Sequence, residues 1–424
     1  MDNKYLIRRV QNQTDINKLI ILLNNVFQPE RVGNLAKIFL ESLPESECKY
    51  WFIAEEKETK NIVSSFTLIP WCWELKGIKL KVAEMGLVAT DVNHRGKGLM
   101  RLLNQEFDAV LKEEEFDLAV IQGIPGFYHK FGYHYAIPME NHLNICLKNI
   151  PSQAKTRRFE IRNAEISDIP FLISEDKSYR DANYISVFRN TNTWEYILRQ
   201  GRKTEYGSDV IILEFEQEKF YCRILFQGFG KGLIVSEVSN SISEESFMFL
   251  LTYLKNRAII ENKAFIRFNV GLDSRLGEML LSAGVQKSKP YAWQVKIPDK
   301  INFLNKLKPV LESRIGNSEF YDFSKILRLD FYSETIDVIF KNGKITEFLR
   351  NIKNEPDFSF NIPVDLFASL ILGHRNWVEL QENRPDIASM LLYIDPEEKP
   401  MDDISGKLID ILFPKQKSWI NLQY

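Results

Sequence analysis

Two stretches of the chain share one pattern of apolar and polar positions. Residues 5–23 read YLIRRVQNQTDINKLIILL, and residues 159–173 read FEIRNAEISDIPFLI. In each, a short strand-like run contains Ile-Arg, a polar turn follows, and an Asp-Ile pair precedes apolar residues at helical spacing. A carboxylate is favoured near the free N–H groups that begin a helix, so we expect Asp15 and Asp168 in N-terminal turns. This self-similarity predicts two related domains.

The same order of elements follows each opening. Apolar runs predict three strands in each copy: 51–56, 61–75 and 78–90 in the first, and 208–216, 219–229 and 231–239 in the second. We expect the second of these strands to bend near Pro70. A helical pattern at 245–260 comes next, and the run 264–270 then matches 117–124 of the first copy. Alternating strands and helices predict an α/β (α+β) fold.

The pattern changes after about residue 298. Residues 301–315 predict a helix, and two strand patterns meet at Asn342-Gly343, which is a strong hairpin signal. The runs 363–373 and 386–394 predict helices packed on that sheet. We therefore divide the chain into three domains, at 1–150, 151–297 and 298–424.

Composition narrows the class of protein. The chain has 424 residues, with 55 lysines and arginines against 57 acidic residues, so its net charge is −2. That balance argues against nucleic acid as the main partner. The four cysteines and five histidines show no metal-ligand spacing, so we expect no metal site. The opening MDNKYLIRRV has no apolar core of a signal peptide, and no run is long enough to cross a membrane; we expect a soluble, cytoplasmic protein.

One short stretch carries candidate chemistry. Residues 88–100 read VATDVNHRGKGLM and place two glycines and two cations between a strand and an amphipathic helix. Glycines let the backbone approach a ligand, and the free N–H groups at a helix start bind phosphate. The P-loop pattern G-x-x-x-x-G-K-S/T is absent from this stretch. The pattern G-x-G-x-x-G is not met either, because residue 101, where its last glycine would stand, is arginine. A pyrophosphate cradle is the functional reading, and a helix entry that uses glycine only for a tight turn is the alternative.

This stretch resembles the acetyl-CoA motif of the GNAT acetyltransferases, Gln/Arg-x-x-Gly-x-Gly/Ala, except that Met100 replaces the small last residue. The resemblance implies acetyl-CoA as cosubstrate, with no metal. It also implies that backbone groups of three residues pair with the pantetheine arm: Val88, Ala89 and Thr90. Seven more would surround the pyrophosphate: Arg95, Gly96, Lys97, Gly98, Leu99, Met100 and Arg101. Gly123 and Ile124 would contact the acetyl end.

A second segment, GFYHKFGYHYA at 126–136, is similar to the region of the catalytic tyrosine in the Eis (enhanced intracellular survival) branch of GNAT proteins. That branch has a GNAT domain, a degenerate second GNAT domain and a sterol-carrier-protein-like (SCP2-like) C-terminal domain. The resemblance therefore implies tandem GNAT folds, each a mixed central sheet flanked by helices, followed by an SCP2-like domain. It also implies a homo-oligomer, with a hexamer as the expected form.

The resemblance assigns roles to two tyrosines. Tyr128 matches the general acid that protonates the leaving thiolate. The C-terminal carboxylate, here that of Tyr424, matches the base, and Glu84 in its strand is a competing base. Trp71 and Trp73 are candidates for an acceptor pocket or for one face of the core.

The expected activity is direct transfer of an acetyl group to a primary amine of an aminoglycoside-like or polyamine-like small molecule. A non-catalytic protein that binds a CoA ester or a lipid is the rival reading.

Overall fold

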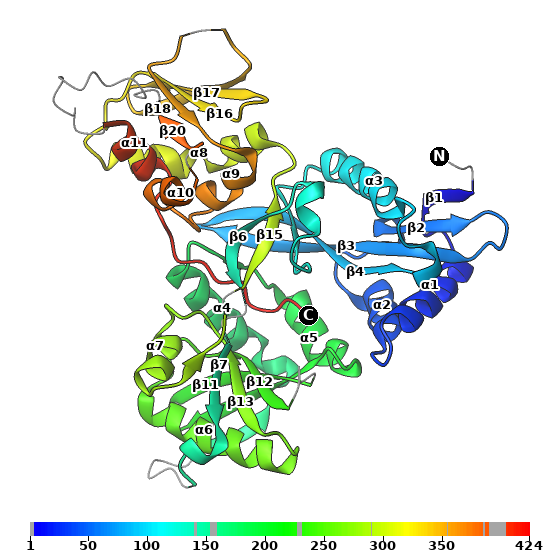
Figure 1. Cartoon of the computed structure of the whole chain (residues 1–424). Coiled ribbons are helices and arrows are strands. Elements are labelled where there is room, and N and C mark those ends of the chain that lie inside the picture. The colour runs from blue at the N-terminus through cyan, green and yellow to red at the C-terminus, as the bar shows by residue number, and fades with distance from the viewer. Residues whose placement is uncertain are drawn as a thin grey trace.

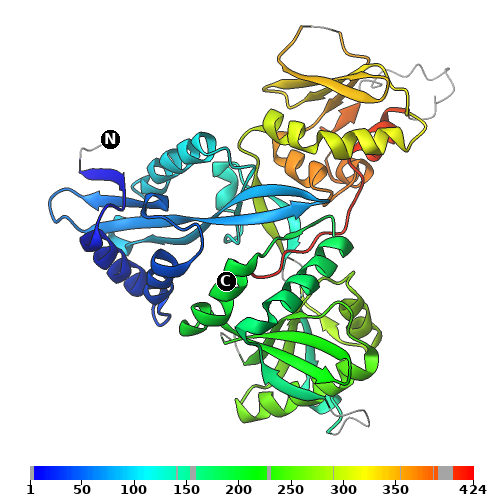
Figure 2. The ribbon, with the colours of Figure 1, turned by 180° about the vertical axis from the view of Figure 1, so that it is seen from behind.

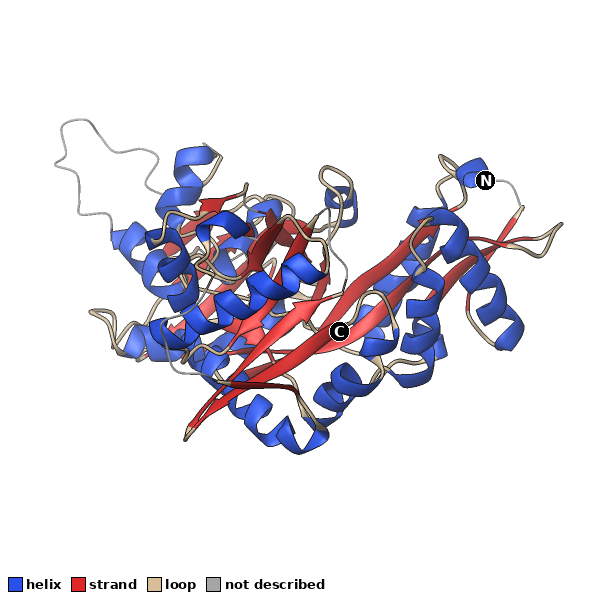
Figure 3. Ribbon diagram, turned by 90° about the horizontal axis from the view of Figure 1, so that it is seen from below, coloured by secondary structure: helices blue, strands red, loops and turns tan. Residues whose placement is uncertain are grey.

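The computed structural model describes residues 4–139, 142–152, 159–226, 231–289, 291–353, 355–384, 386–389 and 404–424. Its described strands form three sheets, and each sheet carries its own helices. Figures 1 and 2 show three lobes, with the C-terminal segment running from the third lobe to a position between the other two. Figure 3 shows the strands of the lobes flanked by helices, as the α/β prediction requires.

The first sheet has the strand order β1-β2-β3-β4-β5-β15-β6, and β9 also pairs with β3. Its strands are β1 (Tyr5–Arg9), β2 (Trp51–Glu56), β3 (Ile62–Leu75), β4 (Ile78–Thr90), β5 (Leu118–Ile121), β6 (His134–Met139), β9 (Ile185–Val187) and β15 (Tyr291–Lys296). Within it, β4 and β5 are parallel.

Helices cover both faces of this sheet. They are α1 (Gln13–Val26) and α2 (Val32–Ser42) on one face and α3 (Leu99–Glu113) on the other. Successive residues of a strand point to opposite faces. Accordingly, Leu68 of β3 packs in the same core as Phe107 of α3, while Ile69 packs in the core that holds Leu19 of α1. Burial on both faces explains why β3 is apolar for almost its whole length.

Pro70 does not interrupt β3, which is one continuous strand of 14 residues. Pro70 lies opposite Ala83 of β4. On the other edge of β3, the pairing with β2 covers Thr67 and earlier residues, and the pairing with β9 begins at Trp73. The missing N–H of the proline thus falls in a gap between two partners and removes no ladder hydrogen bond.

The second sheet has the order β14-β7-β13-β12-β11-β10-β8. Its strands are β7 (His142–Cys146), β8 (Glu160–Asn163), β10 (Ser208–Phe215), β11 (Glu218–Leu225), β12 (Gly232–Val238), β13 (Phe265–Asn269) and β14 (Gln286–Lys287). The helices of this region are α4 (Ile169–Ala182), α5 (Thr191–Arg199), α6 (Glu244–Ile260) and α7 (Arg275–Ser282). As in the first sheet, one central pair, β12 and β13, is parallel and is joined through a helix.

The first two sheets exchange strands across the predicted boundaries. Strand β7 precedes residue 150 and pairs in the second sheet, whereas β9 and β15 lie within 151–297 and pair in the first. The boundaries therefore do not separate the two sheets, although each sheet has its own buried core on at least one face. The sequence repeat marks the start of each domain but carries no signal for this exchange.

The third sheet has the order β18-β17-β16-β19-β20. Its strands are β16 (Ile326–Asp330), β17 (Thr335–Lys341), β18 (Lys344–Arg350), β19 (Phe358–Asn361) and β20 (Ala388–Ser389), and its helices are α8 (Lys300–Gly316), α9 (Val364–Ile371), α10 (Trp377–Asn383) and α11 (Ile404–Leu412). Asn342 and Gly343 both have positive φ, which confirms the predicted hairpin turn. The helix predicted at 386–394 is wrong at residues 388–389, which pair with β19; residues 390–394 lie outside the described part of the chain.

The repeated Ile-Arg and Asp-Ile pairs form the same ion-pair clamp in both domains. Arg8 on β1 donates to Asp15 in the first turn of α1 at 2.6 Å and to Glu55 of β2 at 2.5 Å. In the second domain, Arg162 on β8 meets Asp168, just before α4, at 2.6 Å. Both aspartates thus lie at helix starts, as predicted, and each ties a helix to an edge of its sheet.

The C-terminal segment crosses the interface between the lobes. After α11, the backbone N–H of Trp419 donates to the carbonyl of Ile185 at 3.1 Å, and the carbonyl of Lys417 accepts from the N–H of Tyr184 at 2.6 Å. Trp419, Ile420 and Asn421 are all buried. Among the described helices, none is both long and apolar enough to span a membrane.

Candidate active site

The cationic glycine turn joins β4 to α3 through a short 3-10 turn at Val92–His94. Gly96 and Gly98 have φ of 73° and 76°, a region that side chains disfavour, and a Cβ on either would meet no atom within 4 Å. Gly98 is the N-cap of α3, no side chain caps the helix, and its first turn has no acidic residue. The first N–H groups of α3 are therefore open to an anion.

The cations beside this turn fold back along it. The Nε atom of Arg95 donates to the carbonyl of Thr90 at 3.2 Å, and Nζ of Lys97 donates to the carbonyl of Asn93 at 2.8 Å. All of the predicted residues from Arg95 to Arg101 line one groove of about 830 Å³, together with Val88, Thr90, Ile124 and Tyr128. The structure thus brings most of the predicted cofactor residues together. Ala89 and Gly123 are buried beside the groove and are not part of its lining.

Two irregularities of β4 open this groove, and sequence reasoning missed both. The parallel pairing of β4 with β5 ends at Glu84 and Val120, although β4 continues to Thr90. Leu87 has a φ of 49°, and the ladder between β3 and β4 shifts register beside it. Such a bulge re-aims backbone groups and bends the strand. The diverging strands leave room for an extended ligand along Val88–Thr90.

Tyr128 stands in the groove at the start of the 3-10 turn Tyr128–Phe131. Its side chain is mostly buried, and burial raises the pKa of its hydroxyl to about 12. The phenol therefore stays protonated at neutral pH and can donate a proton. A Cβ on Gly123 would lie 2.2 Å from the Tyr128 ring, so only glycine lets the tyrosine reach this position. The carbonyl of Gly123 is fixed by the hydroxyl of Tyr291 and by Nε2 of Gln294.

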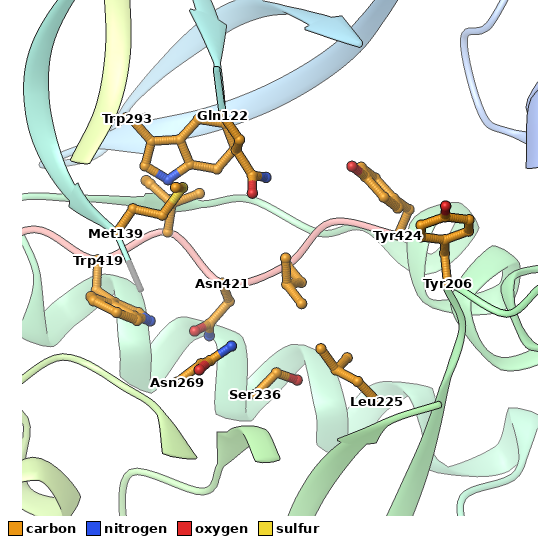
Figure 4. A pocket seen from close by; sticks show the side chains of 12 residues that line it. Gln122, Met139, Tyr206, Leu225, Ser236, Asn269, Trp293, Trp419, Asn421 and Tyr424 are labelled. Atoms are coloured by element: carbon orange, nitrogen blue, oxygen red, sulfur yellow. The ribbon is translucent and has the colours of Figure 1, made fainter. Parts of the chain in front are cut away.

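Tyr424 lies in a second cavity, of about 210 Å³, which Figure 4 shows. Nη2 of Arg223 donates to the backbone carbonyl oxygen of Tyr424 at 2.7 Å, and the fully buried Arg223 is itself paired with Glu237. The ring of Tyr424 stacks on Trp71 with centroids 5.7 Å apart. The arginine holds the end of the chain in place, a role for Arg223 that no short motif signals.

Both cavities are lined by the short segment that follows β5. Gln122 lines the second cavity, Ile124 lines the groove, and only Gly123 separates them in sequence. Tyr128 and Tyr424 thus line two neighbouring spaces that flank one short segment. This arrangement suits a reaction in which one substrate enters from each side.

Glu84 is buried next to the same segment. Its carboxylate accepts a hydrogen bond from Nε1 of Trp71 at 2.7 Å. Burial raises the pKa of Glu84 to about 7, and the indole only partly offsets that shift. A carboxyl group with this pKa can exchange a proton near neutral pH.

Two further side chains near the site, those of Trp73 and His94, make contacts within the fold. Trp73 is fully buried, packs edge-on against Trp293 and donates from Nε1 to Gln423 at 2.9 Å, so it belongs to the core. His94 lies in the groove wall and contacts the hydroxyl of Tyr5 at 3.0 Å. Within the described residues there is no cluster of three or more metal-ligating side chains.

Residues 7–136 match the family model of the acetyltransferase (GNAT) domain, so this part of the chain is a GNAT acetyltransferase domain. None of the curated protein sequences matches the chain.

Solved structures share the fold along the whole chain. A conserved protein of unknown function from Enterococcus faecalis V583, described as a probable N-acyltransferase, has 14% identity and a TM-score of 0.70 over 99% of both chains. A GCN5-related N-acetyltransferase from Anabaena variabilis has 11% identity and a TM-score of 0.66, covering 98% of this chain and 99% of that one. Eis1 from Mycobacterium abscessus has 12% identity and a TM-score of 0.63, covering 99% of this chain and 100% of that one. At these identities the likeness establishes the fold.

Proposed function

We propose that the protein is an N-acetyltransferase that moves an acetyl group from acetyl-CoA directly to a primary amine of a small molecule. One observation carries the proposal: the uncapped start of α3 opens into the groove that also holds Tyr128. The helix start and its cations suit a pyrophosphate, and the diverging strands β4 and β5 suit the pantetheine arm. Neither feature is needed for a protein that only packs a helix on a sheet.

The chemistry divides between the two cavities. The neutral amine attacks the thioester carbonyl from the side of Tyr424, a C–N bond forms and the C–S bond breaks. The leaving thiolate takes a proton from the Tyr128 hydroxyl, and the amine gives up a proton to a base. Holding both substrates on either side of Gly123 supplies proximity, which is a large part of the rate.

Two groups are candidates for the base. Tyr424 lines the second cavity and Arg223 donates to its backbone oxygen, so we take the carboxylate of Tyr424 as the first candidate. Glu84 has a pKa of about 7, which suits proton exchange, but its carboxylate is buried and bound to Trp71. We favour the terminal carboxylate, because residues at the end of the tail form the wall of the cavity.

The resemblance to Eis proteins supports the finer parts of this proposal. We propose that the chain belongs to that branch, with an SCP2-like third domain that supplies the C-terminus and with assembly into a homo-oligomer, for which a hexamer is the expected form. Aminoglycosides and polyamines are the acceptors that the resemblance suggests, and they belong in any test panel. The rival, a non-catalytic binder of a CoA ester or lipid, gives no role to the Tyr128 hydroxyl.

A thiol-release assay with acetyl-CoA and a panel of primary amines tests the proposal. Tyr128→Phe is expected to lower kcat about 100-fold or more while acetyl-CoA affinity stays within about twofold, because only the proton donor is lost. Tyr133→Phe is the matched control, since Tyr133 is a buried neighbour whose hydroxyl has no hydrogen-bond partner among the described residues. Equal rates for Tyr128→Phe and the control would refute the role of Tyr128.

The base is tested by extending the chain. A short tag after Tyr424 is expected to abolish turnover, whereas acetyl-CoA binding is retained. Undiminished turnover by the tagged protein would remove the terminal carboxylate from the mechanism and assign the base to Glu84. Tight binding of acetyl-CoA without turnover of any amine by the untagged protein would favour the rival.

A further inference from the structure

The second cavity is small for the acceptors that the family resemblance suggests. Its volume is about 210 Å³. An engineered protein cavity of about 150 Å³ holds one benzene molecule, and sites for drug-sized ligands usually occupy about 300–1,000 Å³. The space beside Tyr424 therefore matches one ring with a short substituent and is too small to enclose a molecule of three linked sugar rings.

The walls of this cavity are aromatic and apolar at two ends. Figure 4 shows Trp293 and Trp419 at one end and Tyr206 at the other, with Asn421 between them. Trp293 and Trp419 are almost fully buried. Indole and phenol rings pack best against flat apolar groups, with added stabilisation from ring–ring geometry. Such walls favour a flat apolar body in the ligand.

The polar groups of the cavity are neutral. Both side-chain atoms of Asn421, Nδ2 and Oδ1, are buried and have no hydrogen-bond partner among the described residues, and Nε1 of Trp293 is in the same state. A buried polar atom left unpaired is energetically unfavourable. In Figure 4, the amides of Gln122 and Asn269 approach the same space from opposite sides. This set of donors and acceptors matches a hydroxyl or amide group on a ligand.

The described lining contains no acidic side chain. Among the lining residues, Tyr424 would bring a negative group through the carboxylate that we propose as the base, and Arg223 already donates to its backbone oxygen. A polyamine or an aminoglycoside carries several ammonium groups, and each one moved out of water needs an anionic partner. One carboxylate can serve the single amine that reacts, and it leaves further cations without partners.

From these observations, and resting on the proposed function, we infer that the acceptor is a small monoamine with a flat apolar body and one neutral hydrogen-bonding group. Its ring lies between the tryptophans and Tyr206, and its hydroxyl or amide pairs with Asn421. Its amine points to the end of β5, toward the acetyl group across Gly123. The cavity selects against polycations by both size and charge.

A panel matched in chemistry tests this inference. Tyramine, 2-phenylethylamine, spermidine and kanamycin are compared in the thiol-release assay with acetyl-CoA saturating. The kcat/KM for tyramine is expected to exceed that for spermidine and for kanamycin at least tenfold, and that for 2-phenylethylamine about fivefold. A higher kcat/KM for either polycation would overturn the inference and leave the proposed function intact.

Asn421→Leu separates the role of the amide from general packing. This variant keeps the side-chain size, so it is expected to abolish the preference for tyramine over 2-phenylethylamine while retaining turnover of the latter. Ser418→Ala is the matched control, because Ser418 is buried in the same tail and faces a different cavity. An unchanged preference in Asn421→Leu would overturn the pairing with Asn421.

Direct measurement of tyramine binding tests the inference even if no amine is turned over. Trp293 and Trp419 line the cavity, so their fluorescence is expected to change saturably with tyramine and to show weaker binding in Asn421→Leu. Absence of turnover with every amine, despite bound acetyl-CoA, would refute the proposed function but not this binding. Absence of saturable tyramine binding, or tighter binding of spermidine, would overturn the inference.

Discussion

Helices α3 and α6 follow equivalent central strands of the two related domains, but their first turns differ in charge. Helix α3 begins at Gly98, without a side-chain cap or an acidic residue in its first turn. Helix α6 begins with Ser243, whose side chain accepts from the N–H of Ser246, followed by Glu244 and Glu245. The second domain therefore satisfies its helix start internally and surrounds it with negative charge, which repels phosphate. One fold thus gives an anion site or a closed helix start, depending on a few residues.

Copying that charge into the first domain gives the largest expected effect. Met100 lines the groove at the second position of α3, which corresponds to Glu245 in α6. Met100→Glu is expected to weaken acetyl-CoA binding about 100-fold, which is about 2.7 kcal/mol. Thermal stability is expected to hold, because a carboxylate in the first turn favours the helix. Isothermal calorimetry and a melting curve measure the two effects.

Met100→Gln is the control for this change, since the glutamine side chain has the shape of glutamate without its charge. Its affinity for acetyl-CoA is expected to remain within about threefold of the parent protein. Equal affinities of the Glu and Gln variants would show that the cofactor does not lie at the start of α3.

The two domains also treat a buried glutamate differently. Glu237 on β12 is fully buried; burial alone would raise its pKa, but the guanidinium groups of Arg189 and Arg223 lower it below the usual range. Glu84 on β4 is equally buried, which raises its pKa to about 7, and among the described residues only the indole of Trp71 donates a hydrogen bond to it. The paired glutamate anchors the chain end, and the other remains able to change its protonation state.

Glu84→Gln sharpens this second contrast. Because the folded protein binds a proton at Glu84 more tightly than the unfolded chain, the stabilising contribution of that proton is present at low pH and is lost as the pH rises through about 7. Between about pH 5 and about pH 8, the parent protein is expected to lose about 2 kcal/mol of stability relative to Glu84→Gln. Urea unfolding at several pH values measures the difference. Parallel stability profiles of the two proteins would contradict the raised pKa.

Sequence predicts the elements that depend on local pattern. The glycine turn before α3, the Asn342-Gly343 hairpin and the repeated clamp residues all lie where their spacing predicts. Each of these features is set by neighbours within a few residues. The motif around Tyr128 singles out that residue, and the structure places it in the lining of the groove.

Features that depend on distant contacts could not be predicted. The exchange of β7 and β15 between sheets is decided by pairings across more than 100 residues. Arg223 has no motif around it, yet it binds the last residue of the chain. The positive φ of Leu87 belongs to a residue type that rarely adopts it, so sequence statistics argue against the bulge that opens the groove. The raised pKa of Glu84 follows from its burial, and the sequence of a single strand does not show whether a glutamate in it is buried or exposed.

The ion-pair clamps give the smallest expected difference between the domains. Arg8 holds Asp15 and Glu55, and the other cation near Glu55, Lys60, lies 3.8 Å away. In the second domain, Lys219 lies 2.8 Å from Asp168 and 3.1 Å from Glu214, so the carboxylates there keep a partner when Arg162 is removed. Arg8→Met is therefore expected to destabilise the protein by about 2 kcal/mol and Arg162→Met by about 1 kcal/mol.

Denaturant unfolding of both variants measures this difference, and a Lys219→Met background tests its cause. With Lys219 absent, the loss caused by Arg162→Met is expected to rise to that of Arg8→Met, because both clamps then leave carboxylates without a close cation. If Arg162→Met remained the milder change in that background, the difference would arise from the greater exposure of Arg162, whose side chain is 33% accessible against 19% for Arg8. The larger destabilisation caused by Arg8→Met would then come from the packing of the Arg8 side chain rather than from its charge.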